Sequence, residues 1–155
     1  MKRLADEKLQ AFFVGALCAN IHIHQELFMS TKPVRIPGPD HPISVDAGNV
    51  RVVVTLGGHT IADSRAVLTL REAAYPPVYY IPREDVDMSL LERTAHSTYC
   101  PYKGECAYYS IPAGGARSVN AIWSYEDPHP AVAAIKDHVA FYPDRVDAIT
   151  VSKAG

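Results

Sequence analysis

Cysteine is scarce in this sequence, where only Cys18, Cys100 and Cys106 occur among 155 residues. Their number is odd, and no C-x-x-C pair is present to begin a structural zinc site. A chain of this length with 48% hydrophobic residues can bury a core without disulfide bonds. We therefore expect reduced cysteines, a cytoplasmic location, and neither a bound metal nor another cofactor.

An excess of charge of one sign is lacking as well. The 15 basic and 17 acidic residues are interspersed, and the formal net charge is only −2. Because nucleic-acid binding needs a basic stripe that neutralises successive phosphates, no nucleic-acid partner is expected. The apolar runs are too short to span a bilayer, so no membrane partner is expected either. The sequence leaves the oligomeric state open.

Twelve prolines and nine glycines are dispersed along the chain, which favours short strands and turns over long helices. Gly57-Gly58 predicts a two-residue turn between strands at 51–56 and 59–62. Further strands are predicted at 66–71, 78–81, 118–125, 138–142 and 146–151, and on both sides of a turn at 100–104. Short helices are predicted from Pro82 to before Thr94 and at 131–136. This order predicts a mainly β protein, an antiparallel barrel or a folded-over sheet.

The first 48 residues are interpreted as an N-terminal extension and a Pro-rich, loop-like connector, and residues 49–155 as the β domain. Residues 1–28 favour a short amphipathic helix that folding of the domain does not require. A secretory signal is the weaker alternative, because Asp6 lies in the region that should be basic and Leu17 occupies the cleavage position. Met29 is an alternative start of the protein.

The stretch from His96 to Ser110 carries the densest chemistry of the chain. Proline favours the second position of a turn and glycine its exit, so Cys100 and Lys103 are expected to face each other across one turn. A nearby lysine ammonium favours the thiolate form of a cysteine. Cys100 and Lys103 are therefore the candidate catalytic pair. The alternative is a packed cysteine beside a solvated turn lysine.

His96 and Thr98 share a face with Cys100 if the strand is regular. Four residues of strand separate His96 from Cys100 by roughly 13 Å, so this histidine can contact a ligand but cannot deprotonate the thiol. A base would have to be one of three other histidines: His59, His129 or His138.

Aromatic residues surround the turn in sequence. Such residues more often form a core and its rim than a ligand platform. A cleft that they line beside Lys103 would nevertheless suit a small planar or anionic molecule. The candidate ligand-binding residues are His96, Thr98, Tyr102, Tyr109, Trp123 and Tyr125.

Four spaced pieces of sequence occur together: Thr98-x-Cys100-Pro101-x-Lys103-Gly104, Tyr108-Tyr109-Ser110, Trp123-x-Tyr125-x-x-Pro128-x-Pro130 and Ala140-Phe141-Tyr142. In this combination, residues 50–151 resemble the bacterial domain-of-unknown-function family 427. The resemblance implies a compact, mostly antiparallel, tent-like β domain with no settled activity. Tyr102 stands where the family usually has tryptophan, and Glu105-Cys106 and Asp137-His138 also depart from its pattern. The shape or polarity of a pocket near these positions is therefore expected to differ.

Three functional hypotheses remain open for the site around the Cys-Pro-Tyr-Lys-Gly turn. The first is a small-molecule enzyme that uses the Cys100 thiol, and the second is a module that binds a small ligand without catalysis. The third is a structural or protein-interaction domain in which the motif only fixes a turn. Phosphate-binding, dinucleotide-binding and G-x-S-x-G motifs are absent, so the familiar nucleotide and hydrolase functions are unsupported.

Overall fold

The computed structural model describes residues 32–155. The amphipathic helix and the alternative signal segment that the sequence predicted fall within residues 1–31, outside the described part. The chain separates into two units, Met1–Val34 and Arg35–Gly155, and the account below concerns the second. Between residues 32 and 155, no helix has the length and apolar character needed to cross a membrane.

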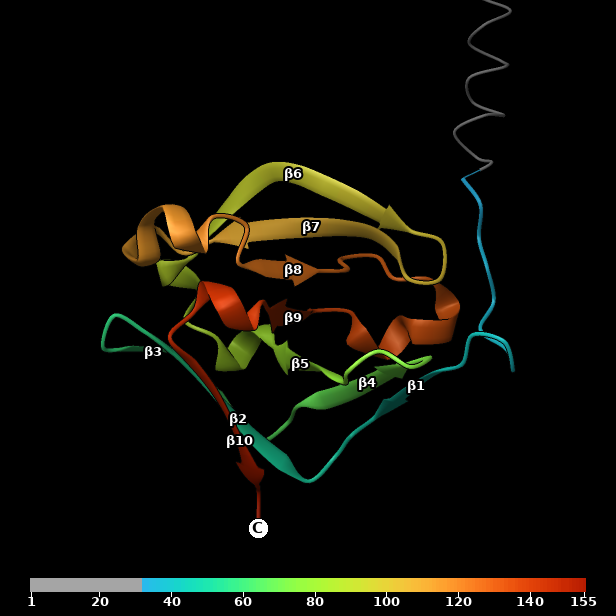
Figure 1. Cartoon of the computed structure of the whole chain (residues 1–155), viewed down its shortest axis with the longest axis horizontal. Coiled ribbons are helices and arrows are strands. Elements are labelled where there is room, and N and C mark those ends of the chain that lie inside the picture. The colour runs from blue at the N-terminus through green and yellow to red at the C-terminus, as the bar shows by residue number, and fades with distance from the viewer. Residues whose placement is uncertain (1–31) are drawn as a thin grey trace, which may run out of the picture. The chain divides into compact units, whose positions relative to one another are not determined.

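The larger of two sheets has seven strands in the order β1-β4-β5-β9-β8-β7-β6, and all neighbours are antiparallel (Figure 1). Its strands are β1 (Ile43–Asp46), β4 (Leu68–Glu72), β5 (Val78–Pro82), β6 (Glu92–Cys100), β7 (Gly104–Ser110), β8 (Ile122–Ser124) and β9 (His138–Phe141). Hairpin connections between consecutive strands, such as β6–β7, give the antiparallel order.

The smaller sheet contains β10 (Ala148–Lys153), β2 (Val50–Leu56) and β3 (His59–Ser64), in that order. Gly57 and Gly58 join β2 to β3 and both have positive φ, 58° and 79°, as a type I′ hairpin turn requires. The hairpin prediction is therefore confirmed. The described strands form two separate antiparallel sheets and do not close into a barrel, so the folded, mainly β alternative is the right one.

Two clusters of buried side chains pack on opposite faces of the larger sheet. Ile81 and Val139 belong to the first cluster, whereas their chain neighbours Tyr80 and Ala140 belong to the second. Successive residues of a strand point to opposite faces, so the central strands β5, β7, β8 and β9 supply both clusters. The first cluster also contains Val52, Val54 and Ile61 of the smaller sheet. The second includes Val132 and Ile135 of the 3-10 segment η4 (Pro130–Ile135).

The helix predicted to begin at Pro82 is wrong. The chain instead makes two separate 3-10 turns, η1 (Arg83–Asp85) and η2 (Met88–Leu90). Val86 between them is extended and forms a β-bridge with Ala62, which interrupts helical hydrogen bonding. Tertiary pairing with β3 thus overrides the local helix signals. The short helix predicted at 131–136 is present as η4, although in 3-10 form with a break at Val132.

Several strand predictions need correction. The strand expected at 118–125 is only Ile122–Ser124, because residues Pro112–Ser118 form the 3-10 segment η3. β4 and β10 begin two residues later than expected. β1 lies inside the segment predicted to be a loop, where it pairs with β4 despite its short length. A last 3-10 turn, η5 (Pro143–Arg145), precedes β10.

Gly114 within η3 sits against the smaller sheet, and a Cβ there would lie 2.5 Å from Ser118 Cβ and 2.9 Å from Leu56 Cδ2. Gly114→Ala should therefore lower the free energy of unfolding by about 2–3 kcal/mol through overpacking. Chemical denaturation measures the change. Gly38→Ala is the control, because a Cβ at Gly38 meets nothing within 4 Å. Equal stabilities of the two variants would contradict the prediction.

Candidate functional site

The Cys-Pro-Tyr-Lys-Gly segment forms the turn between β6 and β7, as the sequence predicts. The Lys103 N–H donates to the Cys100 carbonyl at 3.2 Å, and the His129 N–H donates to the Lys103 carbonyl at 2.9 Å. Gly104 has a φ of 111°, which side-chain-bearing residues rarely adopt. A Cβ at Gly104 would also lie 3.3 Å from the Asp127 carbonyl oxygen. The turn is thus held in place by the loop that precedes η4.

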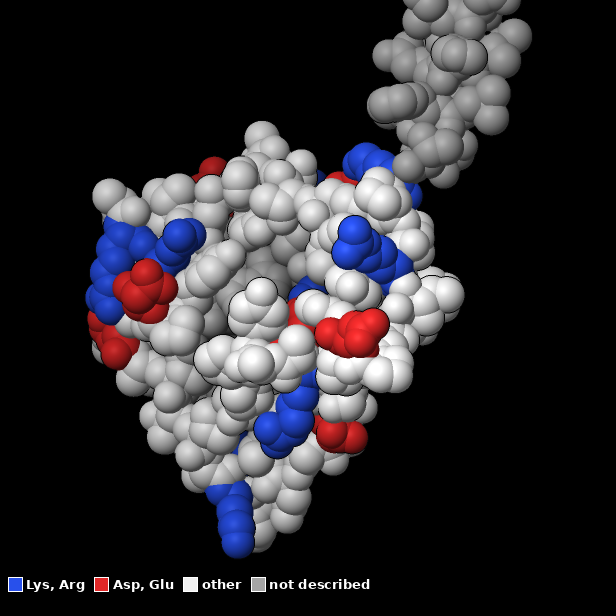
Figure 2. Space-filling model, turned by 45° about the vertical axis from the view of Figure 1, so that its right-hand side comes forward, with Lys and Arg blue, Asp and Glu red and all other residues white. Residues whose placement is uncertain are grey.

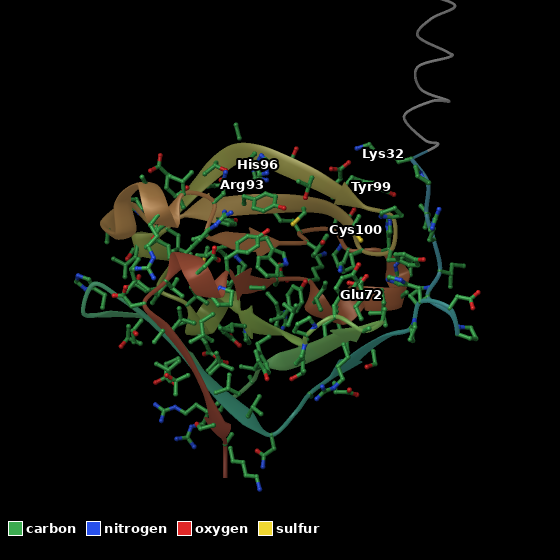
Figure 3. All side chains as sticks on the ribbon, viewed as in Figure 1. Lys32, Glu72, Arg93, His96, Tyr99 and Cys100 are labelled. Atoms are coloured by element: carbon green, nitrogen blue, oxygen red, sulfur yellow. The ribbon has the colours of Figure 1, made fainter. Side chains whose placement is uncertain are left out.

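The Lys103 side chain points to Glu72 at the end of β4. Its ammonium donates to Glu72 Oε1, and the two side chains are only 13% and 15% exposed. His41 Nε2 lies 2.7 Å from the other carboxylate oxygen, and the His41 ring stacks on Tyr102 at 4.1 Å between centroids. We call His41, Glu72, Tyr102 and Lys103 the Glu72 cluster. Glu72, Tyr99 and Cys100 lie at the same end of the sheet, whereas Arg93 and His96 lie farther along β6 (Figure 3).

The charge of Glu72 is stabilised within this cluster. Burial raises the pKa of the carboxyl group, but hydrogen bonds from Lys103 and His41 outweigh that effect and hold the pKa below its usual value. Glu72 therefore stays ionised and compensates the Lys103 ammonium. The ammonium also lies 5.8 Å from the centroid of the Tyr125 ring, so its remaining surroundings are partly aromatic.

Cys106 lies in the second core cluster, where it is 2% exposed. Burial raises the pKa of its thiol. Thr98 Oγ1 and Tyr108 Oη form a 2.8 Å hydrogen bond beside it, and burial raises the pKa of Tyr108 to about 12. Burial also raises the pKa of Tyr80 and Tyr125. This cluster therefore holds neutral thiol and phenol groups at neutral pH.

Cys100 ends β6 and is partly buried against the second core cluster. The sequence proposed its thiol as the partner of Lys103. In the structure the Lys103 ammonium is bonded to a carboxylate, which is a far stronger acceptor than a neutral thiol. A catalytic role of the pair stays a prediction.

A groove of about 810 Å³ lies beside the Glu72 cluster, between the two sheets. Its floor comes from both sheets and consists of Val52, Val54, Ile81 and Phe141. Its rim includes Ile149 and Val151 of β10 and the β4–β5 loop with Tyr75, Pro76 and Pro77. Trp123 also lines it, and the Trp123 indole N–H donates to the Tyr80 hydroxyl at 3.1 Å. Glu72 is the one charged residue of this lining within the described chain.

The candidate ligand-binding residues do not all come together. Trp123 lines the groove, and Tyr102 and Tyr125 adjoin Lys103. Tyr109 lies elsewhere, buried in the first core cluster with the Arg83 guanidinium 5.4 Å from its ring centroid. His96 and Thr98 both contact Tyr108 from the edge strand β6, and His96 lines a separate pocket of about 390 Å³.

Of the three candidate bases, the structure brings His129 to the turn. Its Nε2 lies 3.2 Å from the Tyr99 hydroxyl. His138 Nδ1 lies 2.7 Å from the Lys136 carbonyl, and His59 begins β3 in the other sheet. Between residues 32 and 155, no three His, Cys, Asp or Glu side chains gather in a way that could hold a metal ion.

Sequence reasoning missed Glu72 and His41. Both contacts of Glu72 span 31 residues, and no spacing rule links positions so far apart. The apolar groove was missed for the same reason, since its two walls come from different sheets. The one available signal in the sequence was the position of Glu72, an acidic residue directly after the strand predicted at 66–71.

The family of this chain follows from comparison with known sequences. The model of a family described as a domain of unknown function (DUF427) matches residues 44–152. The chain belongs to DUF427. No curated protein matches it. Two residues of this DUF427 domain were expected to depart from the family pattern. Tyr102 stacks on His41, and Cys106 is buried.

Glu72→Gln should lower the free energy of unfolding by about 1–3 kcal/mol at neutral pH, because it leaves the half-buried ammonium without a counter-charge. The pKa of Glu72 is lowered in the folded protein. Its contribution to the free energy of unfolding is therefore complete at pH values above 4.5, the ordinary pKa, and is lost as the pH falls through the lower pKa of the folded state. The variant should therefore show a flatter decline of stability in acid, as urea denaturation at several pH values measures.

Asp63→Asn is the matched control for this prediction. Asp63 also has a lowered pKa, through its hydrogen bond to Arg51, but that pair is exposed. Exposed ion pairs contribute little to stability. If Asp63→Asn and Glu72→Gln change the acid profile equally, the Glu72 cluster has no special role in stability.

Cys100 should react with iodoacetamide in the folded protein, whereas Cys106 should react only after unfolding. Cys100 is partly exposed, and Cys106 is 2% exposed with a thiol whose pKa burial raises. We expect a difference in rate on the order of 100-fold, set by the opening of the core. Mass spectrometry of each cysteine peptide measures it. A Cys100 that reacts only after unfolding would end the thiol-enzyme hypothesis.

Proposed function

We propose that this domain binds a small, planar and largely apolar molecule in the groove between its two sheets. The observation that carries the proposal is the groove itself, whose volume of about 810 Å³ falls in the range of small-molecule sites. Its lining is almost entirely aliphatic and aromatic. Such a lining provides contact area for a planar, apolar ligand.

The position of the groove relates it to the motif of the family. Glu72 belongs both to the groove lining and to the cluster that contains Lys103 and Tyr102. Trp123 lines the groove and is one of the residues on which the family resemblance rests. The Cys-Pro-Tyr-Lys-Gly turn is thus connected to the groove lining through the contact between Lys103 and Glu72. In this proposal, Lys103 positions Glu72, and Tyr102 positions His41 by stacking on its ring.

A small molecule fits this groove better than nucleic acid does. On the face drawn in Figure 2, Lys and Arg side chains alternate with acidic ones, and mainly uncharged atoms border a hollow. A nucleic acid would need clustered positive charge. The proposal includes a cytoplasmic location, which fits the two free thiols of Cys100 and Cys106. Binding without catalysis is favoured over thiol chemistry, because Lys103 is bonded to Glu72.

Trp123 is the single tryptophan of the chain, so its fluorescence reports on the groove. The uncharged planar dye prodan should accept energy from Trp123, and its emission should shift to shorter wavelength as it leaves water. Val151→Lys places a charge at the rim and should weaken prodan binding about tenfold or more. Titration of each protein with the dye measures both effects.

Val119→Lys is the matched control, because Val119 is 51% exposed, compared with 40% for Val151, and lies outside the groove lining. It should bind prodan as the natural protein does. Equal binding by Val151→Lys, or emission without energy transfer from Trp123, would refute the groove as the site. Binding that weakens as protein concentration rises would assign the groove to a second copy of the chain and would also refute the proposal.

A further inference from the structure

Strands β5 and β9 of the larger sheet pair along only part of their length. Their ladder includes Ile81 and Val139. In the described chain it does not continue to Tyr79 and Phe141, which lie two residues farther along in the same register. Because Pro82 has no N–H, Ile81 and Val139 must be the pair that exchanges both hydrogen bonds. The two strands therefore separate directly beyond this pair.

Two prolines explain why the strands separate. The register of β5 and β9 would bring Pro77 opposite Pro143 if the ladder continued. Neither proline has an N–H to donate, so no hydrogen bond can close the ladder at that point. Both prolines line the groove. The opening between β5 and β9 thus follows from the sequence, and the groove lies along it.

The lining of the groove comes from both faces of the larger sheet. Ile81 and Phe141 belong to the first core cluster. Val78 and Trp123 also line the groove, but they pack against the second core cluster. The Trp123 indole N–H donates across β9 to the Tyr80 hydroxyl of β5. A lining of this kind indicates that the groove enters the opening between the two strands and reaches their backbone edges.

The backbone groups of Tyr79 and Phe141 point into this opening. The Tyr142 N–H donates to the Ala121 carbonyl at 2.8 Å on the β8 side, so the groups of Phe141 point, by alternation, towards β5. Ile81 bonds to β9, and Tyr79 therefore presents its groups to the same side. Each of the two residues places an N–H beside a C=O, as a strand does towards an antiparallel neighbour.

We infer that the groove selects planar heterocycles that carry a hydrogen-bond donor beside an acceptor on one edge, as a lactam does, and binds this edge with the backbone of Tyr79 and Phe141. The inference rests on the proposed function and adds a hydrogen-bonding requirement to it. Backbone groups away from water are normally paired, and a purely apolar ligand would leave these groups without partners. A lactam edge replaces the bonds that the neighbouring strand does not supply.

Two probes of one shape test the inference: 2-quinolone, a neutral planar lactam, and 1-methyl-2-quinolone, in which a methyl group replaces the donor hydrogen. Isothermal titration calorimetry on the full chain measures both affinities. 2-Quinolone should bind about tenfold more tightly, although its methylated analogue is the more apolar molecule. If neither quinolone nor prodan binds, the proposed function fails. If prodan binds but 2-quinolone has no advantage over its analogue, the groove remains a site and the hydrogen-bonding inference alone fails.

A third probe, 4-methyl-2-quinolone, controls for the size of the added methyl group. It keeps the donor beside the acceptor and should bind as 2-quinolone does. If both methylated probes bind equally weakly, size and not the lost donor explains the difference, and the inference is wrong.

Amide hydrogen exchange identifies the backbone groups that bind the probe. Phe141 is one of four phenylalanines and Tyr79 one of nine tyrosines, so selective ¹⁵N labelling gives few signals. Phe141→Leu and Tyr79→Phe assign them by removing one signal each. 2-Quinolone should slow exchange at one or both amides by about tenfold or more relative to 1-methyl-2-quinolone. Unchanged exchange at both positions would overturn the inference.

The double variant Pro77→Val with Pro143→Val restores an N–H at both opposed positions and should let the ladder close the opening. 2-Quinolone should then bind about fivefold more weakly or less. Pro76→Val is the matched control, because Pro76 also lines the groove but lies out of the hydrogen-bonding register with β9. Circular dichroism establishes that both variants are folded, and the probes on the natural protein test the inference if one is not. Equal affinities of the two variants would contradict the opening as the binding site.

Discussion

The ion pair between Lys103 and Glu72 connects parts of the domain that are far apart in the sequence. It joins the β6–β7 turn to the end of β4, and His41 adds the loop before β1 through the second carboxylate oxygen. Two half-buried charges cannot remain unpaired without a large loss of solvation. The position of the turn and the ionisation of Glu72 therefore depend on one another.

The two faces of the larger sheet provide different chemical environments. One face meets the smaller sheet through aliphatic side chains and opens into the groove. The other holds Cys106 among tyrosines whose pKa values burial raises. Trp123 connects these environments, because it lines the groove and donates a hydrogen bond to Tyr80 of the second core cluster. A ligand in the groove would thus contact a side chain that is anchored in the core.

The same arrangement favours our proposal of ligand binding over thiol catalysis as the role of the family motif. A catalytic thiolate needs a nearby positive charge that is not already paired with an anion. The Lys103 ammonium is paired with the Glu72 carboxylate, and Cys106 lies in an apolar interior that favours the neutral thiol. The Pro-Gly turn allows the close approach of the loop before η4 and holds Lys103 against Glu72.

Local features of the sequence determined the mainly β class, the Gly57-Gly58 hairpin, the turn at Cys100 to Gly104 and the family. Each depends on residues that are close in the chain, where glycine conformation and side-chain alternation act directly. Tertiary structure alone decided that two 3-10 turns replace the helix after Pro82, that Tyr109 points away from the turn, and that Glu72 receives Lys103. These outcomes depend on pairing across 31 residues or between sheets, and no local periodicity encodes such contacts.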